Sequence, residues 1–140
     1  MMRVVSREIE LTSKGFTDIL DLTPRLDQLV RREGFREGHL LVFVPGSTGG
    51  LTTIEYEPGL VEDLKRFFEQ WIPMDRDYAH NFAWQDGNGY AHLRAAMLKP
   101  DLMIPIVNGR MALGTWQQVV FIDFDNRKRH RRLVVQFQGL

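Results

Sequence analysis

The sequence predicts a single α+β domain, with a mainly antiparallel or mixed β-sheet packed against about three helices. The segments read as strands, a helix, strands, two helices and strands, which differs from the regular alternation of a βαβ fold. The 140 residues match one domain with a self-sufficient core. No repeat or linker divides them, so residues 1–140 are expected to form one unit.

Three helices are predicted from residues typical of helix ends and from the spacing of apolar residues. In "LTPRLDQLVRREGF", Thr23 stands at the N-cap position, Pro24 at the first helical position and Gly34 at the end. "EPGLVEDLKRFFEQWIP" is the second helix, and the third starts near Gly89 and ends before Pro100. The second helix has an apolar stripe at helical spacing, made of Leu60, Leu64, Phe67 and Trp71.

The remaining apolar segments predict strands. Residues 4–11 and 16–20 form the first two, and the continuous run "HLLVFVP" indicates a strand buried on both faces. "LMIPIVNGRMAL" predicts two strands around an Asn-Gly turn, with Pro105 at an edge or bulge. "TWQQVVFIDF" and "RLVVQFQ" flank the polar turn "DNRKRH", which is expected to close a hairpin.

Composition excludes several classes of protein. The formal net charge is zero, so an overall basic footprint for nucleic acid is missing, and the basic run 127–132 is expected to be a solvated turn. The chain has no cysteine, which excludes disulfides, thiolate metal sites and cysteine nucleophiles. Without a signal peptide or an apolar run of about 20 residues, a cytoplasmic protein with no membrane partner is expected.

The segment "HNFAWQDGNGYAHL" contains His80, Asp86 and His92 around a Gly-rich loop. Imidazole and carboxylate groups together suit Zn²⁺ or another divalent ion with an open position for water or substrate. The same groups could act as general acid and base, because histidine titrates near neutral pH. The spacing of these residues matches no standard metal motif. In the alternative interpretation, His80 makes a hydrogen bond within the loop and His92 lies on the surface of a helix.

Two further segments carry polar groups. In "PGSTGGLTTIEYEPG", small hydroxyls and glycines after a buried strand suit phosphate, or serve a tight connection between strands. In "GRMALGTWQQ", Arg110 can hold a carboxylate or phosphate in a fork, Trp116 offers an apolar wall, and Gln117 or its neighbour faces inward. In the alternative interpretation of "GRMALGTWQQ", these are ordinary residues at the ends of strands.

With these segments in view, the chain resembles the YjbQ family, also called secondary thiamine-phosphate synthases. The resemblance rests on "VFVPGSTGGLTTIEYEPGLVEDL", "YAHN", "GNGYAHLRAAMLKPDLMIPIVNGRMALGTWQQVVFIDFD" and "RRLVVQFQG". It covers nearly all of the chain and is weakest at the N-terminus. Many members have a histidine directly after the strand-end proline, where this chain has Gly46, so it is similar to a Gly-Ser-Thr branch.

The resemblance implies a homotrimer of α+β subunits whose polar motifs gather in one cleft. It also implies an activity, which joins hydroxymethylpyrimidine diphosphate to a thiazole phosphate and releases pyrophosphate. A metal-dependent hydrolase and a non-catalytic trimer that binds a phosphorylated metabolite are the alternatives.

The residues expected in that cleft fall into three overlapping groups. The catalytic group is His80, His92, Arg110, Trp116 and Gln117. The phosphate-binding group is Ser47, Thr48, Gly49 and Arg110. The ligands for a divalent metal, Zn or Mg, would be His80, Asp86 and His92.

Overall fold

The computed structural model describes residues 1–140 and confirms the α+β class, with eight strands and four helices. In chain order the elements are β1 (Arg3–Ser13), β2 (Asp18–Asp21), α1 (Thr23–Glu33), β3 (Gly38–Phe43), β4 (Gly49–Ile54), α2 (Pro58–Trp71), α3 (Ala79–Trp84), α4 (Gly89–Met97), β5 (Asp101–Val107), β6 (Arg110–Met111), β7 (Gln118–Asp123) and β8 (Arg129–Gly139).

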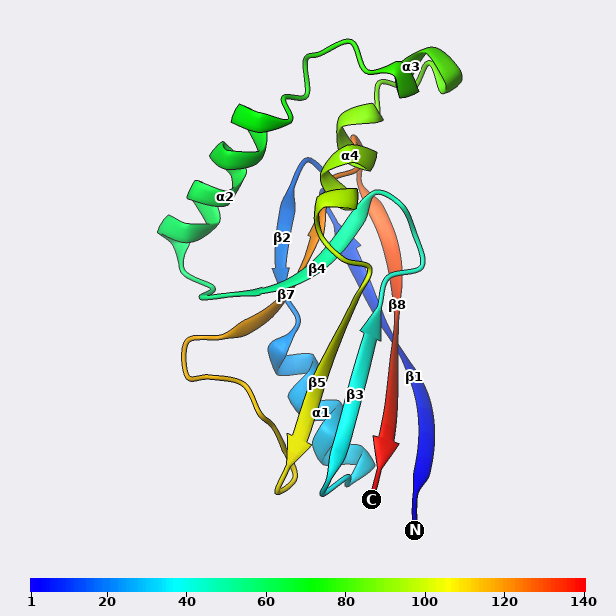
Figure 1. Ribbon diagram of the computed structural model, residues 1–140, viewed down its shortest axis with the longest axis vertical. Helices are drawn as coiled ribbons and strands as arrows, with labels where there is room; N and C mark the ends of the chain where they lie inside the picture. Colours follow the sequence, from blue (N-terminus) through cyan, green and yellow to red (C-terminus); the bar gives the residue numbers. More distant parts are fainter.

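The strands form two antiparallel sheets. Five strands are arranged in the order β1-β8-β3-β5-β6, and three in the order β2-β7-β4. Both chain termini lie at the same end of the five-stranded sheet, while α2, α3 and α4 gather toward the other end of the molecule (Figure 1). No helix is both long enough and apolar enough to cross a membrane.

Strand β7 joins the two hydrophobic cores because it is buried on both faces. Val119 and Phe121 belong to the core that the five-stranded sheet shares with α1. Val120 and Ile122 point the opposite way, into the core formed with α2 and α4. The period-two alternation of a strand therefore makes the three-stranded sheet a middle layer between the larger sheet and these helices.

Strands β3 and β8 approach so closely at their ends that only glycine fits. Gly38 lies opposite Gly139, and both have positive φ, 147° and 158°. A Cβ atom on Gly139 would lie 2.1 Å from the carbonyl oxygen of Glu37. This pair closes the end of the sheet where the chain terminates.

We expect Gly139→Ala to lower the free energy of unfolding by about 1–3 kcal/mol or more, from backbone strain and the steric clash together. Gly114→Ala is the matched control, because the nearest atom to its Cβ would be 3.7 Å away. Its effect should stay within about 0.5 kcal/mol. Urea denaturation of both variants measures the difference, and equal stability would contradict the close approach.

Two sequence expectations about single elements need correction. Strand β3 is not buried on both faces, since Leu40 and Val42 are buried while Phe43 is exposed. Thr23 is the first helical residue rather than the N-cap, which is Leu22. The Thr23 hydroxyl instead accepts a hydrogen bond from the Val119 N–H, at 2.8 Å, and so ties α1 to β7.

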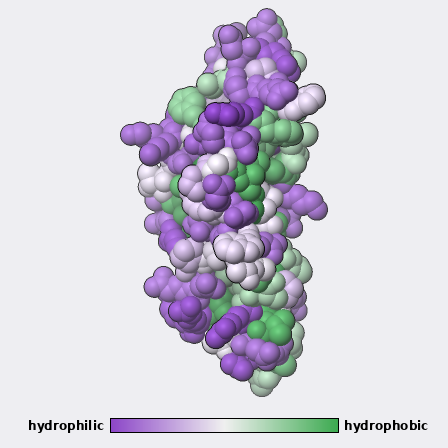
Figure 2. All heavy atoms as spheres, turned by 90° about the vertical axis from the view of Figure 1, so that its left-hand side faces the viewer, coloured by the Kyte–Doolittle hydropathy of each residue, from purple (hydrophilic) through white to green (hydrophobic).

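Two expectations about helices also differ from the structure. Helix α2 buries only Phe68, and the expected stripe residues Phe67 and Trp71 are 53% and 62% exposed. The side of the molecule that carries α2 displays hydrophobic atoms among hydrophilic ones (Figure 2). Helix α3 was not expected, because its six residues are too few to establish a periodic pattern and none of them is buried.

The expected hairpin between the last two long strands does not exist. Strand β7 pairs with β2 and β4, whereas β8 pairs with β1 and β3. The segment "DNRKRH" therefore passes from one sheet to the other. This crossing places the polar ends of both strands against the loop between β3 and β4.

Candidate functional site

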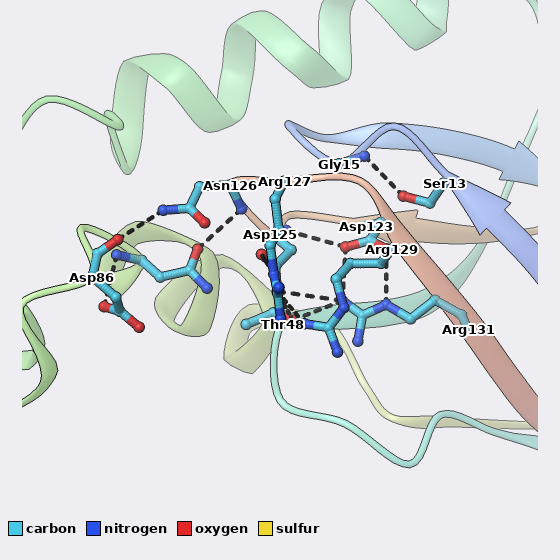
Figure 3. Close-up of polar contacts among 11 residues, drawn as sticks. Ser13, Gly15, Thr48, Asp86, Asp123, Asp125, Asn126, Arg127, Arg129 and Arg131 are labelled. Atoms are coloured by element: carbon cyan, nitrogen blue, oxygen red, sulfur yellow. Dashed lines mark hydrogen bonds and ion pairs between the residues drawn. The ribbon is translucent and has the colours of Figure 1, made fainter.

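A polar cleft lies where β7 ends and β8 begins. Its volume is about 500 Å³, and none of its twelve lining residues is hydrophobic. The loop after β3, the loop before α4 and the crossing segment between the sheets supply most of its wall (Figure 3). The lining residues are Pro45, Gly46, Ser47, Thr48, Asp86, Asn88, His92, Asp125, Asn126, Arg127, Arg129 and Arg131.

The floor of the cleft is a buried ion pair between the two sheets. Asp123 lies on the same face of β7 as Val119 and Phe121, toward the five-stranded sheet, and is fully buried. Arg131 on β8 is 6% exposed. Nε and Nη2 of Arg131 donate to the two carboxylate oxygens of Asp123, each at 2.8 Å. This bidentate geometry fixes the guanidinium plane.

A second carboxylate extends the network toward the cleft. Asp125 accepts hydrogen bonds through Oδ2 from the Thr48 hydroxyl, at 3.0 Å, and from Nη1 of Arg129, at 2.7 Å. Thr48 in turn accepts a bond from Nη2 of Arg131, at 2.7 Å. Oδ1 of Asp125 is buried and has no hydrogen-bond partner.

Donors remain free on the arginines of the cleft. Nη1 of Arg131 makes no hydrogen bond, and neither do Nε and Nη2 of Arg129. A Cβ atom on Gly46 would lie 3.3 Å from Nη1 of Arg131, so the glycine leaves that group uncovered. Arg127 lies 4.0 Å from Asp125 and is largely exposed. The cleft thus offers guanidinium N–H groups to an anion.

Two side chains of asparagine join the loops around the cleft. Nδ2 of Asn126 donates to the carbonyl oxygen of Asp86, at 2.8 Å, and the Asn126 N–H donates to Oδ1 of Asn88, at 3.1 Å (Figure 3). The carboxylate of Asp86 accepts from the Asn88 N–H. The loop before α4 is therefore held against the crossing segment.

His80 and His92 lie face to face beside this loop. Their ring centroids are 4.2 Å apart with an interplanar angle of 31°. Nδ1 of His80 is buried, lies 3.9 Å from Oδ1 of Asp86 and has no hydrogen-bond partner. His92 also borders a smaller hollow of about 290 Å³, which shares Gly46 and Ser47 with the cleft.

Two groups of the site have shifted pKa values. Burial and the neighbouring His80 lower the pKa of His92 below 6.5, so its imidazole is neutral at pH 7. Burial acts to raise the pKa of Asp123, but hydrogen bonds from Arg131 and Ser13 outweigh it and hold the pKa below 3.8. An ionised carboxylate therefore lies beneath Arg131, and a neutral imidazole lies at the rim of the cleft.

The three side chains expected to hold a divalent metal do not form a metal site. No group of three histidine, aspartate or glutamate side chains in the chain is arranged to hold an ion. Stacking explains this result, because His80 and His92 meet through their ring faces, whereas metal ligation needs their nitrogen lone pairs to converge on one point. The residues present do not fit the metal.

The single cleft expected from the sequence is divided in this chain. His80, Asp86 and His92 do lie together, and Ser47 and Thr48 line the same cleft. Three expected catalytic residues lie near the start of β7 rather than at its end. They are Arg110, Trp116 and Gln117. One of them, Arg110, was also expected to bind phosphate.

Three of the expected site residues make other contacts within this chain. The Gln117 side chain is engaged with Gly114 and Thr53, and Trp116 is 74% exposed beside Tyr56. Gly49 begins β4, and a Cβ atom there would lie 2.6 Å from the Phe121 ring, so packing accounts for this glycine.

The residues that the sequence interpretation missed are Asp123, Asp125, Arg129 and Arg131. The basic run 127–132 was expected to be solvated, yet Arg131 is among the buried residues. The available signal was alternation: Arg129, Arg131 and Leu133 fall on one face of β8 at period two. That face continues into the core, so the arginines had to point inward with it.

The chain is similar to members of one protein family over most of its length. The model of the family described as "UPF0047 protein YjbQ-like" matches residues 7–140. A UPF0047 protein of Archaeoglobus fulgidus is 36% identical over 129 residues, covering 92% of this chain and 98% of that protein. A UPF0047 protein of Synechocystis is 36% identical over 135 residues, covering 95% and 91%.

Solved structures give the same result. A YbjQ-like protein of unknown function from Sulfolobus solfataricus superposes with a TM-score of 0.94 at 28% identity, over 100% of both chains. An uncharacterized conserved protein of the yjbq/upf0047 family from Clostridium acetobutylicum gives 0.85 at 30% identity, covering 94% of this chain and 98% of that chain.

Proposed function

The chain belongs to the YjbQ-like UPF0047 family, and on this premise we propose that its polar cleft binds the phosphate groups of a small metabolite and supports a thiamine-phosphate synthase type of transfer. In this reaction the bond between the pyrimidine methylene carbon and a diphosphate oxygen breaks. The thiazole nitrogen forms a new bond to that carbon, and the electron pair leaves with pyrophosphate.

The observation that carries the proposal is the set of free guanidinium donors in a cleft with no hydrophobic lining. Arg129 and Arg131 are held in place by Asp125 and Asp123, yet each keeps N–H groups without partners. Donors fixed before the reaction stabilise a leaving anion at no cost of reorganisation. The volume of about 500 Å³ suits a small-molecule ligand.

His92 is assigned the second role in the cleft. Its imidazole is neutral at pH 7, because burial and His80 lower its pKa. A neutral imidazole can take a proton from the amino group of the pyrimidine as the diphosphate leaves, and can return it once the thiazole nitrogen has bonded to the methylene carbon. Ser47 lines the cleft and its hydroxyl makes no hydrogen bond within the chain, which supports assigning it to a phosphate oxygen.

The experiment is to supply hydroxymethylpyrimidine diphosphate with thiazole phosphate and to measure thiamine phosphate and pyrophosphate. We expect both products from the wild type, and a loss of roughly 10²-fold or more in turnover for Arg129→Gln, as for removal of one oxyanion donor. Arg132→Gln is the matched control, because it lies on β8 with its side chain 65% exposed. Its rate should match the wild type.

The assay distinguishes an enzyme from a non-catalytic binder. Binding of the diphosphate to the cleft without product would replace the enzyme by a non-catalytic binder of a phosphorylated metabolite. If the protein neither binds the diphosphate nor forms product, the proposal is refuted. The homotrimer implied by the family resemblance is part of the same proposal, and light scattering on these samples tests it against the 16.3 kDa of one chain.

A further inference from the structure

Three arginines of the chain have no partner, and all three line one cavity. Arg31, Arg36 and Arg110 make no side-chain hydrogen bond, ion pair or cation–π contact. Every other arginine has at least one such contact. The cavity that the three share has a volume of about 720 Å³.

This cavity is separate from the polar cleft. Gln117 and Gln118 border it at the start of β7, whereas Asp125 borders the cleft just beyond the end of the same strand. At about 3.3 Å per strand residue, the two sites are on the order of 20 Å apart. A ligand in one does not touch the walls of the other.

The charge of the cavity favours an anion. Asp27 is the only carboxylate among its fourteen lining residues, so three arginines and one aspartate give a net charge of +2. An unpaired guanidinium offers five N–H donors in a rigid fork that matches phosphate and carboxylate oxygens. A cavity lined mainly by one sign of charge concentrates ions of the other sign.

The backbone fixes two of the arginines relative to each other. The Gly109 N–H donates to the carbonyl oxygen of Arg36, at 2.9 Å, and the Asn108 N–H donates to Oε1 of Glu37, at 3.0 Å. A Cβ atom on Gly109 would lie 3.2 Å from Nη1 of Arg36, so glycine permits this close approach. The turn that carries Arg110 is thereby held beside Arg36.

We propose that this cavity is a second ligand site, which binds a small polyanion bearing two or more phosphate or carboxylate groups. Three like charges around one hollow repel each other, and a bound polyanion relieves that repulsion. The volume lies within the range of small-molecule sites. The site does not depend on the transfer reaction assigned to the polar cleft.

The test is a residue-resolved NMR titration with pyrophosphate in 150 mM salt, followed by one with citrate to compare phosphate with carboxylate. We expect saturable shifts of the Gly109 and Gly114 amides, which border the cavity. Arg36→Gln and Arg110→Gln should each weaken this binding by about tenfold or more, the loss of a charge-assisted contact. Both arginines are exposed, so the variants should fold.

The matched control is Arg66→Gln on α2, whose side chain is 76% exposed and lines neither site. It should bind as the wild type does, and so should Arg129→Gln at this cavity. Absence of saturable shifts with both anions, or equal binding by all variants, would overturn the proposal. The Gly46 and Asn126 amides report binding in the polar cleft separately. Absence of shifts at those two amides would count against the proposed function but not against this second site.

Discussion

Replacing Arg131 with methionine is expected to lower the free energy of unfolding by about 3–5 kcal/mol, because it leaves a buried carboxylate without its partner. Asp123 is fully buried and has both oxygens bonded to Arg131. The pair lies at the junction of β7 and β8, which belong to different sheets. Its loss therefore weakens the contact between the two layers as well as the floor of the cleft.

The same pair predicts how stability depends on pH. The pKa of Asp123 lies below 3.8 in the folded chain, so the unfolded chain takes up this proton first as the pH falls. The contribution of Asp123 is complete above the unfolded value near 3.8 and is lost as the pH falls through the lower folded value. Urea denaturation between pH 2 and pH 7, at roughly half-unit steps, measures this dependence.

Two variants control this experiment. Arg132→Met is the neighbouring change on β8, where the side chain is 65% exposed and its ion pair with Glu10 contributes at most about 1 kcal/mol. The double change Asp123→Leu with Arg131→Met removes both charges and should recover much of the loss. A small effect of Arg131→Met alone would mean that the pair is not buried in solution.

The fold was largely predictable because its signals are local. Alternating and continuous apolar segments marked the strands other than β4, and the Asn-Gly turn between β5 and β6 was placed correctly. Strand pairing was not local. The segment "DNRKRH" has the composition of a hairpin turn, and only the contacts of β7 with β2 and β4 reveal that it crosses between sheets.

The candidate site was predictable in part for the same reason. His80, Asp86 and His92 are near in sequence and lie together in space. Arg110 and the cleft arginines have the same chemistry, so residue type could not decide which of them lies beside His92. That assignment depends on which end of β7 each segment meets, and this is set by the tertiary fold.

Replacing His92 with glutamine is expected to reduce kcat/KM of the proposed transfer by about 10²–10⁴-fold, the usual contribution of a positioned acid or base. Glutamine keeps a polar side chain of similar reach but cannot titrate. The matched control is His130→Gln on β8, whose side chain is 57% exposed and lies outside the cleft. It should leave the rate unchanged.

The pH profile separates a chemical role of His92 from a structural one. Neutral His92 is the active form, so the wild-type rate should fall as the pH drops through a pKa below 6.5. Because the charge of His80 helps to lower the pKa of His92, His80→Gln should move the acid limb to higher pH. NMR titration of the His92 ring should move in parallel. An acid limb that persists in His92→Gln would assign the titration to another group and remove His92 from the proposed chemistry.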